Sequence, residues 1–250
     1  MTSHLEQGIR FEEEERYQEA IVEYGLAAQE EPDNPVPLIR KGALLNEMGE
    51  FELALPPLNS ALSIDGGDLF ALSFRGDVYS SLQRYEEAIA DFSAVIAFDP
   101  YDVDAFYNRG LAYANADQAG RAIEDFSTAI QLDPHHGGAF NNRGLAYYRT
   151  GEYQAALLDF TQAVTVRAGF ACSYTHRGRV YEALGDTAKA IEDYTQALAI
   201  SPADPTTLFF RGTLYFAANA EEKGREDFET LIETAPHDNI FRALALKKRE

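Results

Sequence analysis

The sequence predicts an all-α protein made of stacked helix pairs, and three observations support this prediction. Glycine recurs every 34 residues through a chain of 250 residues. Between these glycines, apolar residues follow the three- and four-residue spacing that places side chains on one face of a helix. Proline closes most of the intervals, where it ends a helix because it lacks a backbone N–H. A constant interval of this length is typical of repeat proteins built from one small unit.

The recurring positions fix the register of the repeat. Each glycine is followed three residues later by a large apolar residue, twelve later by alanine or glycine, and sixteen later by another large apolar residue. The glycines are Gly8, Gly42, Gly76, Gly110, Gly144, Gly178 and Gly212. In this register we expect seven repeats, at residues 1–34, 35–68, 69–102, 103–136, 137–170, 171–204 and 205–238, with residues 239–250 left at the end.

Each repeat is predicted to contain two helices joined by a tight turn. In the fifth repeat the first helix is predicted from AFNNRGLAYYRTG and the second from EYQAALLDFTQAV. Gly49, Gly151 and Gly185 fall in the turn, where a helix end favours a residue in the left-handed conformation. Glycine inside a helix costs about 1 kcal/mol relative to alanine. Its recurrence at the eighth position therefore indicates that the two helices approach closely there.

The pattern resembles the tetratricopeptide repeat family. In the fifth repeat the matching residues are Phe140, Gly144, Tyr147, Ala156 and Phe160. The resemblance implies a right-handed superhelical solenoid of seven helix-turn-helix repeats with a C-terminal capping helix. It also implies a non-catalytic adaptor or scaffold, whose partner is a protein or peptide bound by the first helices on the concave face.

Two segments depart from the regular pattern. Pro56 and Pro57 stand within the second helix of repeat two, so we expect that helix to begin late or to be irregular. Residues 239–250 are predicted to form the capping helix, with Ile240, Phe241, Leu244 and Leu246 facing repeat seven. The alternative interpretation of this basic segment is a partner-binding tail.

Arginine and aspartate occur together in five repeats. The arginine occupies the seventh position and the aspartate the twenty-third, and pairing within a repeat leaves neither residue without a partner. We therefore expect five structural ion pairs between the two helices of a repeat. The residues are Arg75 and Asp91, Arg109 and Asp125, Arg143 and Asp159, Arg177 and Asp193, and Arg211 and Asp227. The alternative interpretation is a row of arginines that binds a ligand.

Composition excludes several classes of function. The chain has 21 basic and 41 acidic residues, a net charge of −20, which disfavours binding to nucleic acid and to anionic membranes. The single cysteine, Cys172, cannot form an internal disulfide or supply a zinc site alone. Because the first residues lack a signal-peptide pattern, the expected location is cytoplasmic.

Residues with catalytic potential are few. Cys172 has no predicted base partner, and His135 and His136 are adjacent residues in a turn, which is a poor arrangement for a metal. No phosphate-binding loop or catalytic motif is present in the sequence. We therefore expect no enzymatic activity, no cofactor and no bound metal.

The resemblance places six positions of each first helix in the partner-binding groove. Aromatic rings there bury area at low entropic cost, and asparagine can donate to and accept from a peptide backbone. The candidate residues are Phe70, Phe74, Tyr107, Asn108, Asn141, Asn142, Tyr148, Arg149, His176 and Arg179. Arg149 and Arg179 form a local basic spot, so an acidic or backbone-rich segment is the expected ligand. The alternative function is a self-assembling scaffold that forms homo-oligomers through the ends of the solenoid.

Overall fold

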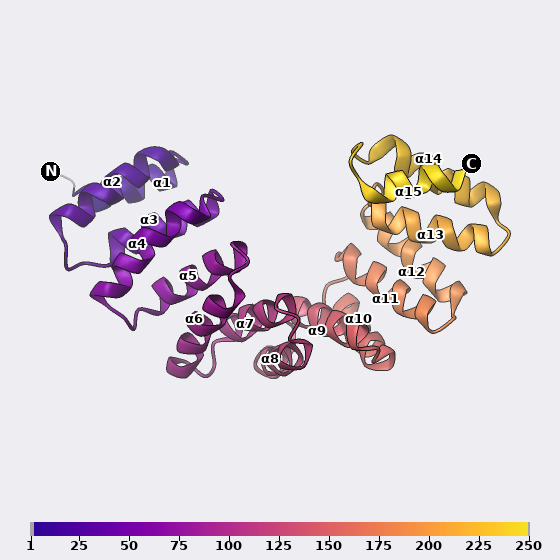
Figure 1. The fold of residues 1–250 in the computed structure, drawn as a ribbon, viewed down its shortest axis with the longest axis horizontal. Helices are drawn as coiled ribbons and strands as arrows, with labels where there is room; N and C mark the ends of the chain where they lie inside the picture. Colours follow the sequence, from indigo (N-terminus) through magenta and orange to yellow (C-terminus); the bar gives the residue numbers. More distant parts are fainter. Residues whose placement is uncertain (1–2, 250) are drawn as a thin grey trace. The chain divides into compact units, whose positions relative to one another are not determined.

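A computed structural model describes residues 3–249, and every regular element in that range is an α-helix (Figure 1). The helices are α1 (His4–Glu13), α2 (Tyr17–Glu30), α3 (Val36–Glu47), α4 (Phe51–Ile64), α5 (Leu69–Ser81), α6 (Tyr85–Phe98), α7 (Val103–Asn115), α8 (Ala119–Leu132), α9 (Gly137–Thr150), α10 (Tyr153–Val166), α11 (Ala171–Ala183), α12 (Thr187–Ile200), α13 (Pro205–Ala217), α14 (Glu221–Thr234) and α15 (Ile240–Arg249). The chain divides into two compact parts, residues 1–132 and 133–250, called here the N-terminal half and the C-terminal half.

Within each half, helices pack against their neighbours along the chain (Figure 1). In the N-terminal half, α3 packs against α4, and α4 packs against α5, the first helix of the next pair. First helices also touch, as α3 and α5 do, and in the C-terminal half α9 contacts α11. This packing of successive helix pairs is the architecture of a helical solenoid, in which each repeat covers the apolar face of the next.

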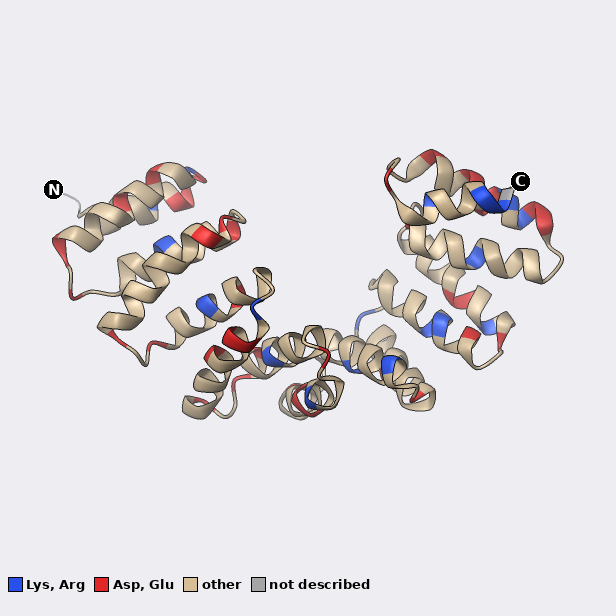
Figure 2. Cartoon of the chain, viewed as in Figure 1, with Lys and Arg blue, Asp and Glu red and all other residues tan. Residues whose placement is uncertain are grey.

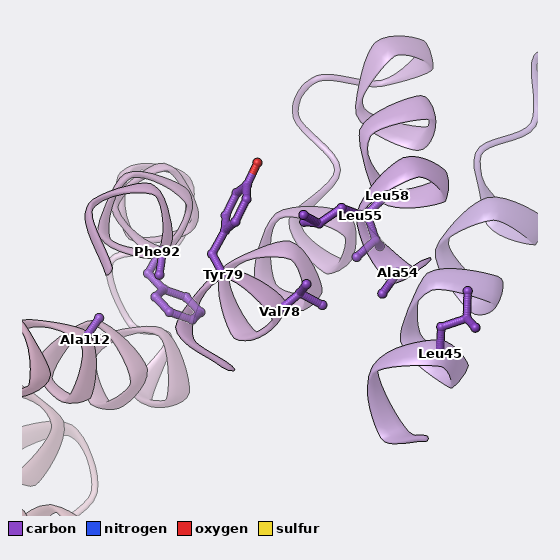
Figure 3. Packing of buried hydrophobic residues seen from close by; sticks show 9 residues of the cluster. Leu45, Ala54, Leu55, Leu58, Val78, Tyr79, Phe92 and Ala112 are labelled. Atoms are coloured by element: carbon purple, nitrogen blue, oxygen red, sulfur yellow. The ribbon is translucent and has the colours of Figure 1, made fainter. Parts of the chain in front are cut away.

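The recurring glycine lets the two helices of a pair come together. A methyl group on Gly76 would lie 2.8 Å from the Phe92 ring, and one on Gly178 would lie 2.6 Å from the Tyr194 ring. Both rings are fully buried, and Figure 3 shows Phe92 within the core near Val78. Any larger residue at the glycine position would have to displace the ring that fills the contact.

The turn between the two helices uses one left-handed residue in every repeat. Glycine occupies that position in three repeats, with φ of +76°, +83° and +81° at Gly49, Gly151 and Gly185. Glu15, Gln83, Asp117 and Asn219 adopt the same conformation in the other four repeats. The backbone therefore keeps its turn where the sequence lacks glycine.

The expectation that two prolines delay or distort α4 is wrong. This helix begins at Phe51 and contains both Pro56 and Pro57. Ala54 and Leu58 are fully buried on either side of the prolines, and Pro57 itself is buried. The apolar packing of this face compensates for the donors that proline removes.

The last helix packs on its neighbours through a different face from the one expected. α15 contacts α13 and α14, which it covers as a capping helix. Its inward residues are Phe241 and the fully buried Ala245, four residues apart on one face. Ile240 is 67%, Leu246 41% and Leu244 38% exposed, so the prediction that they face repeat seven is wrong.

Acidic residues cover much of α1 and α2 (Figure 2). Glu19 of α2 and Glu14 in the turn between the two helices pair with Arg16, and the Tyr24 hydroxyl donates to Glu12. No helix in the described part of the chain is long and apolar enough to cross a membrane.

Candidate protein-binding surface

The N-terminal half contains an apolar hollow on its first helices. α3 contributes Val36, Ile39 and Leu44, and α5 contributes Phe70 and Phe74. The hollow has a volume of about 420 Å³. Because successive turns of two neighbouring first helices line it, the repeat pattern itself brings these side chains together.

Phe70 is the most exposed aromatic residue of this hollow. It is 72% exposed, and Val36 beside the same hollow is 42% exposed. Phe74 is partly buried and packs against the core residues Ile39 and Ala71. A hollow with a fixed ring at its base and a solvated ring at its edge is a surface on which an apolar side chain of another molecule can be buried.

Helices α3 and α5 also line a second, polar hollow. It has a volume of about 330 Å³ and lies between α3, α5 and α7. Its lining residues are Asn46, Asp77, Ser80, Ser81, Asn108, Leu111, Ala112 and Asn115. Since Phe74 and Asp77 are three residues apart on α5, they lie on the same face of that helix.

Asp77 is the charged group of the polar hollow. Asn108 Nδ2 donates to Asp77 Oδ1 over 3.4 Å. Burial and, to a smaller extent, the negative charge of Asp104 together raise the pKa of the Asp77 carboxyl to about 6. Asp77 forms no ion pair with a lysine, arginine or histidine among residues 3–248.

The other candidate groove residue of this half lies elsewhere. The Tyr107 ring packs against the Phe126 ring, with centroids 5.9 Å apart. Tyr107 is not among the residues that line either hollow. Its aromatic ring therefore contributes to the contact between α7 and α8.

In the C-terminal half, Asn141 joins α9 to α11. Its side-chain oxygen accepts from Ser173 Oγ over 3.0 Å and contacts His176 Nδ1 at 3.1 Å. Asn141 is only 5% exposed. Burial lowers the pKa of His176 to about 4, and the charge of Arg179 acts in the same direction. The structure therefore assigns Asn141 to an internal contact and keeps the His176 ring neutral at physiological pH.

Arg179 lies between two aromatic rings of the C-terminal half. Its guanidinium carbon is 5.0 Å from the centroid of Tyr148 and 5.1 Å from that of Phe210. A guanidinium over an aromatic face gains cation–π attraction. Arg149, the residue after Tyr148, is exposed, and Asn142 is half-buried. This arrangement presents positive charge that is partly engaged by rings of the same chain.

A hollow of about 390 Å³ beside Cys172 is lined by polar groups, among them Thr175, His176 and Asp204. Burial raises the pKa of the Cys172 thiol, the opposite of what activates a cysteine nucleophile. His136 uses Nδ1 to accept from the Ala139 N–H and caps α9. The described residues contain no group of three side chains that could hold a metal.

Comparison with known proteins identifies the repeat. Models of the tetratricopeptide repeat match residues 103–136 and 171–204, a second such model matches residues 138–169, and a TPR repeat model matches residues 76–117. Together these matches cover about half of the chain. The chain belongs to the tetratricopeptide repeat family. No curated protein matches it.

Solved structures of tetratricopeptide repeat (TPR) proteins share the fold. A TPR protein from Parabacteroides merdae is 21% identical with a TM-score of 0.77, and the match covers 99% of this chain and 98% of that one. YrrB, described as a TPR protein with an unusual peptide-binding site, is 25% identical with a TM-score of 0.61 over 74% of this chain and 95% of its own. PilF of Pseudomonas aeruginosa is 16% identical with a TM-score of 0.72, covering 85% and 97%.

Salt bridges between arginine and aspartate join the two helices of five TPR repeats in this chain. In each of five repeats, the arginine Nε and Nη2 atoms donate to the two carboxylate oxygens of an aspartate sixteen residues later. For Arg75 and Asp91 the two distances are 2.8 and 2.7 Å, and the Asp91 side chain is 7% exposed against 22% for Arg75. The other pairs have the same geometry. A two-point contact of this kind fixes the orientation of both side chains.

The same arginines make a further contact that the sequence analysis missed. Arg75 Nη1 donates to Asn59 Oδ1 over 2.8 Å, and Arg109 Nη1 donates to Ser93 Oγ over 3.0 Å. Thr161 and Thr195 accept in the same way in the C-terminal half. These acceptors all stand at the twenty-fifth position of the preceding repeat. The sequence signal for this contact is the hydroxyl or amide side chain that recurs at that position.

Proposed function

We propose that this TPR protein is a non-catalytic adaptor that binds a peptide or helical segment of a partner protein on its first helices. The family is typically a protein-interaction fold and not a catalytic one. The single observation that carries the proposal is the apolar hollow with its exposed ring, Phe70. An aromatic side chain has few rotatable bonds and loses little entropy when a ligand covers it, so it is suited to anchor a partner.

The hollows also favour a polypeptide over a small molecule. Helices α3 and α5 line both the apolar hollow and the polar hollow, and the polar hollow carries three asparagines. An asparagine side chain donates and accepts at once, which matches the alternating groups of a peptide backbone. An apolar anchor followed by backbone contacts is a common way to hold an extended or helical segment.

The test is a quantitative affinity pull-down with matched variants. Phe70→Ala should weaken binding of a specific partner by roughly 30-fold, because truncating a central aromatic anchor costs about 2 kcal/mol or more. Phe98→Ala is the control, since Phe98 is 74% exposed but lies outside the hollow. A partner is assigned to the hollow if it is retained by the wild type and by Phe98→Ala and lost by Phe70→Ala.

The proposal fails if every retained partner is indifferent to Phe70→Ala. A partner that is lost instead with Tyr148→Ala would place the binding surface in the C-terminal half, beside Arg179. Purified partner and calorimetry then give the affinity for each variant, and circular dichroism verifies that helicity is unchanged.

Self-assembly is a second candidate function, favoured by the exposed apolar residues of α15. Ile240 is 67%, Leu246 41% and Leu244 38% exposed on a helix that also carries Lys247 and Lys248. Repeat one, with ten acidic and two basic residues, offers the opposite charge. Light scattering that shows no rise in mass with concentration at low salt would exclude this function.

A further inference from the structure

The charges around the two hollows of the N-terminal half are unbalanced. Among the described residues that line them, the carboxylates are Glu12, Glu47, Asp68 and Asp77, and the single cation is Arg40. Arg40 Nη1 already lies 3.5 Å from a carboxylate oxygen of Glu12. The surface that would hold a ligand is therefore acidic as well as apolar.

Among these carboxylates, Asp77 is the one whose ionised form a nearby cation would stabilise most. It is partly buried, and it accepts a 3.4 Å hydrogen bond from an uncharged amide, that of Asn108. The raised pKa of Asp77 agrees with the lack of a cationic partner, because burial and the negative charge of Asp104 both disfavour the ionised form. An ammonium or guanidinium from a ligand would supply the missing partner.

The distance between the hollows suits a short segment. Phe70 and Asp77 are seven residues apart on α5 and Phe74 is three residues from Asp77. At 1.5 Å per helical residue, the apolar hollow therefore lies about 5–10 Å from the carboxylate along the axis. An extended chain covers that distance in two or three residues at about 3.3 Å each.

We propose that the ligand of this surface is a basic segment of another protein, with an apolar side chain in the hollow beside Phe70 and a lysine or arginine two or three residues away at Asp77. This inference rests on the proposed function and names the chemistry of its partner. It differs from the sequence-based expectation of an acidic ligand, because the basic spot at Arg179 is engaged by two rings and the apolar hollow is bordered by carboxylates.

The probe is a phage-displayed library of random twelve-residue peptides, selected on the full chain. We expect enriched peptides to carry an apolar residue close to a lysine or arginine. Asp77→Asn keeps the shape of the side chain and should weaken these peptides about tenfold, the effect of losing a hydrogen bond to a charged group. Glu124→Gln, an exposed residue of α8 that lines neither hollow, should leave their affinity unchanged.

A charge exchange completes the test. A selected peptide with its lysine or arginine changed to glutamate should lose binding to the wild type and regain it with Asp77→Lys. Melting curves of both variants verify that they fold. If Asp77→Lys does not fold, the result with Asp77→Asn still decides the test.

The outcomes separate this inference from the proposed function. If the selected peptides require Phe70 but are neutral or acidic, or bind Asp77→Asn as tightly as the wild type, the proposal of a basic ligand is wrong. The adaptor function is still supported in that case. Peptides that ignore Phe70→Ala, or a selection that enriches none, contradict the adaptor function as well. Peptides that need Phe70, Asp77 and their own cation support both.

Discussion

At the scale of single residues, the arginine–aspartate pairs are expected to be necessary for stability. The Asp159 side chain is 7% exposed and accepts two hydrogen bonds from Arg143. Removing it leaves a mostly buried guanidinium without its counter-charge, which costs about 3 kcal/mol. We expect Asp159→Ala and Asp159→Asn to melt well below the wild type in thermal denaturation.

A matched control decides whether the charge is responsible. Glu192→Ala removes an exposed carboxylate from the same half, and it should change the melting temperature little. If Asp159→Ala and Asp159→Asn melt like Glu192→Ala, the pair contributes nothing measurable to stability.

Residue co-occurrence suffices to name the partner of each arginine, because only pairing within a repeat leaves no residue unmatched. The exposure of single groove positions could not be predicted in the same way. Asn141 and Asn108 stand at neighbouring positions of their repeats, yet Asn141 is covered by Ser173 and His176, whereas Asn108 lines a hollow. Exposure depends on the side chains of the next repeat, which vary, and not on the position in the repeat.

At the scale of helices and turns, the left-handed position offers a simple way to stabilise the chain. Gln83 has φ of +60°, a conformation in which a side chain costs about 1 kcal/mol and glycine costs nothing. Gln83→Gly should therefore raise the melting temperature by a few degrees. The reverse change, Gly151→Gln, should lower it by a similar amount, since Gly151 has φ of +83°. A stabilising effect of Gly151→Gln would contradict this explanation.

The helices could be predicted well because the spacing of apolar residues determines them. The turn glycines and the closing prolines mark most of their ends. Two elements were judged wrongly from local rules. α4 keeps its helix through Pro56 and Pro57 because its apolar face is buried, and α15 turns Phe241 and Ala245 inward instead of Ile240. In both cases the neighbouring helices, and not the local sequence, decide the outcome.

At the scale of the whole molecule, stability should depend on distance along the chain. Within each half, each helix contacts its neighbours in sequence, and first helices contact the next first helix, as α3 and α5 do. In such a protein the free energy of unfolding is approximately a sum of repeat terms and nearest-neighbour terms. A local defect should therefore weaken its own repeat and the adjacent ones most.

Phe92→Ala tests this expectation, because Phe92 is 1% exposed and fills the contact with Gly76. Truncating a buried phenylalanine costs about 3–5 kcal/mol. Native-state hydrogen exchange should show the greatest loss of protection in α5 and α6, a smaller loss in α4 and α7, and no change in α13 to α15. An equal loss in all helices would mean that the chain unfolds as one cooperative unit, and the nearest-neighbour description would then be wrong.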